Sequence, residues 1–155
     1  MKMTFDYNVT IEQFKNTDCG RYGKAFEINV KHFLNGNKGN SDIVSRKGKT
    51  DVQFHGLKLE IKSNCGELDG IEKNDFIIYS MDNESDYIQP EHAVVIPASE
   101  FMALFEELGL VRVKKATSGV KKTTIQSYKN SKKKKAALRI ALDNYITLAE
   151  WAEMV

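Results

Sequence analysis

Apolar and polar residues recur along the chain with two different periods, one typical of helices and one typical of strands. A helix is expected to follow Asp18 and to end at Asn35-Gly36. Its apolar residues, at steps of four, four and three, share one buried stripe: Tyr22, Phe26, Val30 and Phe33. From residue 43 the pattern changes to short segments separated by Lys47-Gly48 and His55-Gly56, which predicts an antiparallel meander of three strands.

The second half of the chain predicts further strands and helices. A loop over residues 64–74 leads to a buried strand at 76–81 and then to another at 93–97. Ser99 is expected to cap a helix that ends at Gly109. Alternation over residues 111–114 predicts a half-exposed strand, and residues 123–128 are candidates for a further extended segment. Two helices complete the pattern, the last of them with a capping box formed by Thr147 and Glu150.

Composition narrows the class of protein. The chain has 155 residues, of which 41% are hydrophobic and 28% charged, so we expect one α/β domain over residues 1–155. No apolar run is long enough to cross a bilayer, and no apolar signal region opens the sequence. Cys19 and Cys65 do not form a secreted disulfide framework. The expected location is therefore the reducing cytoplasm.

Charge is divided unevenly along the chain. Residues 1–110 carry 12 Lys and Arg against 18 Asp and Glu, whereas the basic C-terminal region, residues 111–155, carries 11 against 3. Such a basic block favours a polyanionic partner, most simply nucleic acid, although a solvated basic face is an equally simple interpretation. Tyr128 is a candidate for stacking on a base. The lysines predicted to contact phosphates are Lys114, Lys115, Lys121, Lys122, Lys132, Lys133, Lys134 and Lys135.

Residues 50–63 hold the most informative polar residues. If His55-Gly56 forms a two-residue hairpin loop, Asp51 pairs with Glu60, and Lys62 follows on the same polar face. Two carboxylates about 5 Å apart repel by about 3 kcal/mol at an effective dielectric of about 20. A hard divalent cation, Mg²⁺ or Mn²⁺, would offset this repulsion, and a nearby lysine would assist attack of water on a phosphate. The pattern therefore predicts metal-assisted phosphodiester hydrolysis.

The spacing of Asp51, Glu60 and Lys62 resembles the signature of the PD-(D/E)XK nucleases, the superfamily of restriction endonucleases and many phage or mobile-element nucleases. The resemblance implies an αβββαβ core over about residues 22–109, with a mixed β-sheet flanked by helices. It also implies that Asp51 and Glu60 are metal ligands and that Lys62 is the catalytic lysine. Glu27, on the preceding helix, would be an auxiliary ligand or would position water. A DNA-cutting, magnesium-dependent endonuclease of this kind is plausible as a homodimer.

Other interpretations of the same residues remain open. Glu60 and Lys62 could form the solvated face of an amphipathic strand, and Glu27 could pair with Lys24 or Lys31. A nucleic-acid-binding module of the same fold would then not cleave its ligand. A protein-interaction domain, in which the acidic middle and basic end contact a partner or a second copy, is a third possibility.

Overall fold

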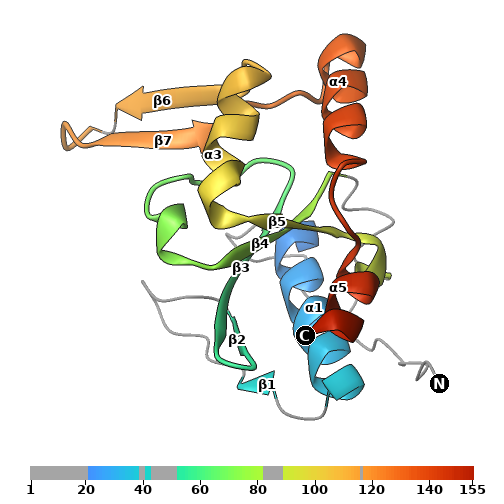
Figure 1. The fold of residues 1–155 in the computed structure, drawn as a ribbon. Helices are drawn as coiled ribbons and strands as arrows, with labels where there is room; N and C mark the ends of the chain where they lie inside the picture. The colour runs from blue at the N-terminus through green and yellow to red at the C-terminus, as the bar shows by residue number, and fades with distance from the viewer. Residues whose placement is uncertain (1–20, 39–40, 43–51, 82–88, 116) are drawn as a thin grey trace.

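The computed structural model describes residues 21–38, 41–42, 52–81, 89–115 and 117–155 (Figure 1). Within these residues a five-stranded mixed sheet has the strand order β1-β2-β3-β4-β5. Helices α1 (Arg21–Lys38) and α5 (Leu148–Met154) pack on one face of this sheet. Helices α3 (Ala98–Glu107) and α4 (Lys132–Leu142) join the hydrophobic cluster on the other face. The α/β class and the mixed sheet flanked by helices are therefore confirmed.

Helix α1 follows the predicted periodicity. Phe26, Val30 and Phe33 are buried and pack against the sheet, as the stripe predicted. The helix continues to Lys38, beyond its predicted end at Asn35-Gly36. One glycine in a helix costs only about 1 kcal/mol relative to alanine, so a glycine in the sequence does not by itself end a helix.

The meander consists of β1 (Ser41–Asp42), β2 (Val52–Phe54) and β3 (Leu57–Ser63), which pair in antiparallel order. Phe54 pairs with Leu57 across the predicted two-residue loop. His55 and Gly56 have φ angles of 51° and 81°, so both central residues of the turn are left-handed, as a type I′ hairpin requires. The hairpin register is confirmed from Val52 onward. The predicted turn at Lys47-Gly48 lies outside the described residues.

Strand β4 (Phe76–Ser80) runs parallel to β3, and β5 (Val94–Pro97) runs antiparallel to β4. The connection from β3 to β4 contains only a 3-10 turn, Ile71–Lys73. Residues 64–74 are thus mainly a loop, as predicted, and this crossover lacks the α-helix of an αβββαβ core. The described residues therefore form an α/β arrangement with a mixed sheet, and the more specific restriction-endonuclease-like core stays a prediction.

Helix α3 begins at Ala98 with Pro97 at its N-cap, so the predicted capping role of Ser99 is wrong. The fixed φ of proline suits a helix start, and it places Ser99 already inside the first turn. Phe101 and Phe105 are fully buried, with ring centroids 5.6 Å and 5.3 Å from that of Tyr79 on β4. Gly109 follows the helix with a φ of 68°, consistent with the predicted end.

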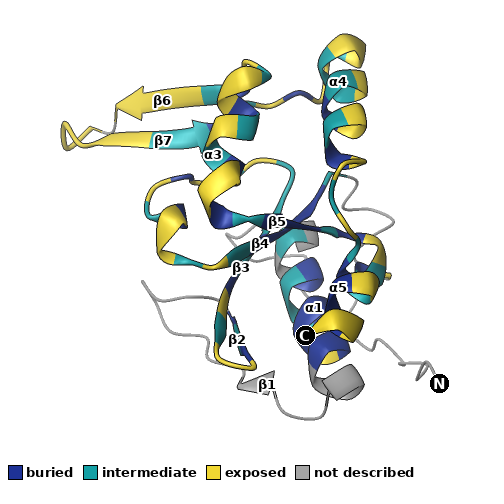
Figure 2. Cartoon of the chain, in the orientation of Figure 1, coloured by how far each residue is buried: buried dark blue, intermediate teal, exposed yellow. Residues whose placement is uncertain are grey.

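Strands β6 (Val111–Lys115) and β7 (Lys121–Ile125) form a separate two-stranded ribbon that projects from the molecule (Figure 1). Most of its surface is exposed (Figure 2). The predicted strand at residues 111–114 is confirmed, but Val113 is 60% exposed and its alternation with charged residues does not mark a buried face. No second layer covers the outer part of the described ribbon, which is why strand periodicity alone could not indicate burial there.

Both C-terminal helices begin with a side-chain cap, of which only the capping box of Thr147 and Glu150 was predicted. Ser131 caps α4, its Oγ accepting a hydrogen bond from the Lys134 amide at 3.2 Å. Thr147 caps α5 in the same way through the Glu150 amide at 3.3 Å. No helix in the described part of the chain is long and apolar enough to cross a membrane.

Candidate functional site

Strand β3 separates its side chains onto two faces of the sheet. Leu59 and Ile61 are buried in the cluster that contains α1. Glu60 and Lys62 project from the opposite face, because alternate residues of a strand point in opposite directions. On that face their neighbours across the parallel pairing are Ile77 and Tyr79 of β4. The structure therefore brings Glu60 and Lys62 together, as the sequence predicted.

The Glu60 carboxylate has a cationic and a neutral polar neighbour. The Nζ atom of Lys62 lies 3.7 Å from Glu60 Oε1, and Asn74 Nδ2 donates to Glu60 Oε2 at 3.5 Å. The side chains of Lys62 and Glu60 are 13% and 22% exposed, so both remain in contact with solvent while most of their surface is shielded. Partial desolvation strengthens the attraction between the two charges. The site can thus present one carboxylate and one ammonium group to a ligand.

Asn74 was not identified from the sequence. Besides its contact with Glu60, its side-chain amide donates to the backbone carbonyl of Ile71 at 3.3 Å, which fixes the amide beside the strand. Asn74 is 14 positions from Glu60 and reaches it only because the crossover leaves the C-terminal end of β3 and brings the start of β4 beside its N-terminal part. No local sequence pattern predicts such a contact, because it depends on the parallel register of β3 and β4.

Asp51 and Glu27 are the two other predicted ligands. Asp51 lies outside the described residues, so its pairing with Glu60 stays a prediction, although the register on which it depends is confirmed from Val52 onward. Glu27 lies on α1, which packs against the opposite face of the sheet from Glu60. Its Oε1 atom lies 3.2 Å from Nζ of Lys31, one of the two pairings considered above. Its role as an auxiliary ligand stays a prediction.

A metal ion at this site would need a second carboxylate, which the sequence predicts to be that of Asp51. Within the described ranges, no three His, Cys, Asp or Glu side chains lie together in a group that could hold a metal ion. Glu60 contributes one carboxylate, a ligand type that Mg²⁺ and Mn²⁺ prefer, and the predicted second carboxylate is that of Asp51. The donor chemistry of Glu60 therefore suits these metals, and Asp51 would have to complete the site.

The loop that follows β3 is hydrogen-bonded to the ribbon formed by β6 and β7. The Leu68 amide donates to the Thr123 carbonyl at 2.8 Å, and the Ile125 amide donates to the Gly66 carbonyl at 2.9 Å. Residues 66–68 consequently form a third antiparallel segment along the free edge of β7, with Glu67 opposite Thr124. The fold therefore places the basic block next to the strand that carries Glu60 and Lys62.

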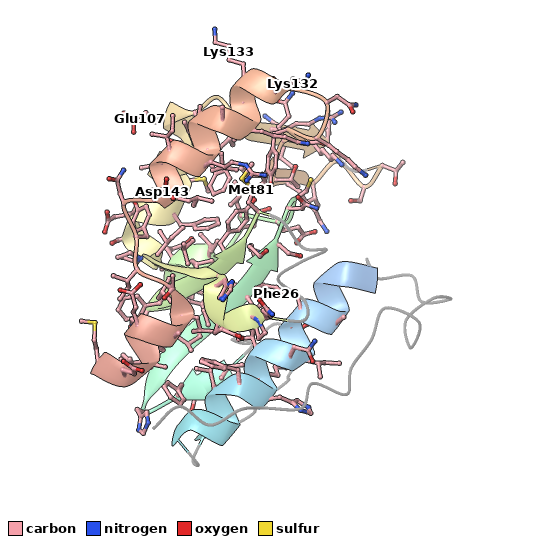
Figure 3. The ribbon with its side chains drawn as sticks, turned by 90° about the vertical axis from the view of Figure 1, so that its right-hand side faces the viewer. Phe26, Met81, Glu107, Lys132, Lys133 and Asp143 are labelled. Carbon is pink, nitrogen blue, oxygen red and sulfur yellow. The ribbon has the colours of Figure 1, made fainter. Side chains whose placement is uncertain are left out.

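The predicted phosphate-binding lysines occupy two places. Lys114, Lys115, Lys121 and Lys122 are exposed on the ribbon, and they oppose one another in the cross-strand pairs Lys114–Lys122 and Lys115–Lys121. Like charges directly opposite each other destabilise a sheet. At the N-terminal end of α4, Lys132 and Lys133 are exposed and point away from the molecule (Figure 3), whereas Lys134 and Lys135 are half-buried.

A buried tyrosine pair holds the turn at the end of β3. The Tyr79 hydroxyl donates to the Asn64 backbone carbonyl at 2.6 Å, and the Tyr128 hydroxyl donates to Asn64 Oδ1 at 3.0 Å. The two hydroxyl oxygens lie 2.8 Å apart, and burial raises the pKa of Tyr79 well above its ordinary value of 10.0. Tyr128 is only 4% exposed, so the prediction that it stacks on a base is wrong. Its aromatic ring instead contributes to the core.

Comparison with known proteins adds no functional assignment. No protein-family model, curated protein or solved structure matches this chain. What the described residues present is a partly shielded carboxylate and ammonium group on β3, with an exposed basic ribbon hydrogen-bonded to the following loop. Function is therefore inferred from these residues and their chemistry.

Proposed function

We propose that this chain is a metal-dependent nuclease that hydrolyses phosphodiester bonds in DNA by a PD-(D/E)XK-type mechanism. The observation that carries the proposal is the placement of Glu60 and Lys62 on one face of β3, with 3.7 Å between Nζ and Oε1. Strand β3 belongs to the hairpin whose register motivated the pairing of Asp51 with Glu60. The neighbouring basic ribbon supports a polyanionic substrate.

Each residue has a defined role in this proposal. Asp51 and Glu60 would hold Mg²⁺ or Mn²⁺. The proposal does not require Glu27, because α1 packs against the opposite face of the sheet from Glu60. A bound divalent ion supplies a polarised water and offsets negative charge on the phosphate. Lys62, whose Nζ lies 3.7 Å from the Glu60 carboxylate, would hold the attacking water and stabilise the charge that develops on the phosphate oxygens. Loss of one such preorganised group typically lowers the rate by about 100- to 1000-fold.

The test is cleavage of linear, circular and branched DNA by the purified protein across a range of Mg²⁺ and Mn²⁺ concentrations. We expect metal-dependent cleavage that falls by about 100-fold or more in each of Asp51→Asn, Glu60→Gln and Lys62→Met. Lys58→Met is the matched control, because Lys58 is exposed on the same strand outside the proposed site. Cleavage that persists in all three site variants would show that these residues do not carry the reaction.

A nucleic-acid-binding module without catalytic activity is the second candidate. The observation that favours it is the proximity of Lys62 to Glu60, because an ion pair can satisfy the carboxylate without a metal. This candidate predicts salt-sensitive DNA binding that is independent of divalent metal and is never followed by cleavage. The same preparation of wild-type protein therefore separates the two candidates.

A further inference from the structure

A pocket of about 480 Å³ lies between the ribbon and the loop that follows β3. We refer to it as the ribbon pocket. Its lining comes from two parts of the chain and includes Cys65, Gly66 and Glu67 on the loop and Lys114, Lys115 and Lys122 on the ribbon. Antiparallel hydrogen bonds between β7 and residues 66–68 hold the two walls together. The pocket is thus built into the backbone pairing of the fold.

The lining of the ribbon pocket carries more positive than negative charge. Glu67 Oε1 lies 3.1 Å from Nζ of Lys122, so the single carboxylate in the lining is used by one of the three lysines. Lys114 lies directly across the ribbon from Lys122, and Lys115 lies across from Lys121. Neighbouring residues of a strand point to opposite faces, so Lys114 and Lys122 share one face of the ribbon, and Lys115 and Lys121 share the other. Lys114 and Lys122 repel each other, and an anion between them would relieve the repulsion. The excess charge therefore favours an anionic ligand.

The pocket also borders the proposed catalytic site. A Cβ atom added to Gly66 would lie 3.4 Å from both Nζ and Cδ of Lys62. Lys62 therefore packs against the loop wall of the pocket, and the absence of a side chain at Gly66 leaves room for its ammonium group. Gly66 is therefore shared by the wall of the ribbon pocket and the surroundings of Lys62.

We propose that the ribbon pocket binds a backbone phosphate of the same nucleic-acid strand that contacts Lys62. This inference rests on the proposed function for the identity of the neighbouring site. Lys114 and Lys122 supply the attraction from one face of the ribbon, and Glu67 weakens it by pairing with Lys122. Phosphate contacts position a strand without reading its bases, so the pocket contributes to affinity for any sequence.

Charge variants of the pocket have opposite expected effects. Lys114→Gln lowers affinity by on the order of three- to tenfold and reduces the slope of log affinity against log salt by about 0.9 for a duplex. Lys115→Gln has a smaller effect, because Lys115 pairs with Lys121 on the other face of the ribbon. Glu67→Gln raises affinity, because it releases Lys122 for the phosphate. The measurement is fluorescence anisotropy of labelled DNA in EDTA, which prevents metal-dependent cleavage. Lys129→Gln is the control, since this exposed lysine does not line the pocket.

Cys65 provides a direct reporter of occupancy, because it is exposed and lines the pocket. In a Cys19→Ser background, we expect an oligonucleotide to slow the reaction of Cys65 with a maleimide. A mononucleotide at the same phosphate concentration should give little protection. Equal protection by the mononucleotide would overturn binding of a strand, and no protection by either would overturn the pocket itself.

The two proposals fail in different ways. If the wild-type protein cleaves DNA but the pocket variants keep its affinity and salt dependence, the ribbon pocket is refuted and the nuclease stands. If the pocket variants lose affinity but the wild-type protein never cleaves, the pocket stands and the nuclease is refuted. In a protein that does both, the pocket variants raise KM at nearly constant kcat, whereas Lys62→Met lowers kcat.

Discussion

At the scale of single residues, the left-handed backbone at His55 and Gly56 determines which face of β3 carries Glu60 and Lys62. A one-residue change in hairpin register would exchange the two faces of the strand. The observed pairing of Phe54 with Leu57 instead keeps Leu59 in the core, so Glu60 stays accessible. The chemistry of the candidate site therefore depends on a turn that takes no part in it.

Tyr79 leads to a prediction at the same scale. Tyr79→Phe removes a hydroxyl that bonds to Asn64 and Tyr128, and should lower the free energy of unfolding by about 1–2 kcal/mol. Because the pKa of Tyr79 is raised in the folded state, the unfolded chain loses this proton first as pH rises. The stabilising contribution is thus fully present below pH 10.0 and is lost progressively above it.

The measurement is urea unfolding of the wild-type protein and Tyr79→Phe from about pH 8 to about pH 11. The stability difference between the two proteins should be constant up to about pH 10 and should then shrink. A difference that stays the same throughout this range would show that the phenol does not titrate differently on unfolding.

At the scale of elements, α4 combines a favourable cap with unfavourable charges. Ser131 satisfies an amide of the first turn, but four lysines, residues 132–135, lie at the positive end of the helix dipole. An arrangement that opposes the dipole is consistent with an anionic partner at this end of the helix. Stability and binding should therefore respond in opposite directions to the same substitution.

Lys133→Glu tests this conflict. We expect the free energy of unfolding to rise by about 0.3–1 kcal/mol, because the new carboxylate favours the helix N-terminus. Affinity for DNA should fall, with a smaller salt dependence, if this end of α4 contacts phosphates. Thermal unfolding and anisotropy give the two readouts. Lys129→Glu is the matched control, because Lys129 is exposed, lies outside α4 and the ribbon, and undergoes the same change of charge.

At the scale of the whole molecule, residues 146–154 add backbone hydrogen bonds beside β5 and contribute side chains to the hydrophobic cluster that contains α1. The Leu148 amide donates to the Ala93 carbonyl at 2.7 Å, and the Val95 amide donates to the Ile146 carbonyl at 2.9 Å. Trp151 follows on α5, with its ring 5.7 Å from that of Phe54 and 5.5 Å from that of Phe76. The last residues of the chain therefore pack against the meander that carries the candidate site.

Trp151→Ala should lower the free energy of unfolding by about 3–5 kcal/mol, because it leaves a cavity between α5 and the meander. The measurement is urea unfolding monitored by circular dichroism, since the substitution removes the sole tryptophan. Met154→Ala on the same helix is the control and should change little, because Met154 is 74% exposed. Equal effects of the two substitutions would show that α5 is not anchored through Trp151.

The local elements could largely be predicted from the sequence, because local patterns determine them. The buried stripe of α1, the His55-Gly56 turn and the cap at Thr147 each depend on residues within a few positions of one another. The same hairpin register predicted that Glu60 and Lys62 share a face. Short-range sterics and alternation are sufficient for these features, and so the sequence by itself determined them.

Contacts between distant segments were decided only by the tertiary structure. Asn74 reaches Glu60 through a parallel crossover, and residues 66–68 pair with β7 across more than fifty positions. Tyr128 carries no sequence signal that distinguishes a buried hydroxyl from an exposed ring. Whether such a contact forms depends on how all the elements pack together, because that packing decides which side chains are buried. For this reason the sequence determined the carboxylate and the lysine, whereas the fold decided that a basic pocket lies beside them.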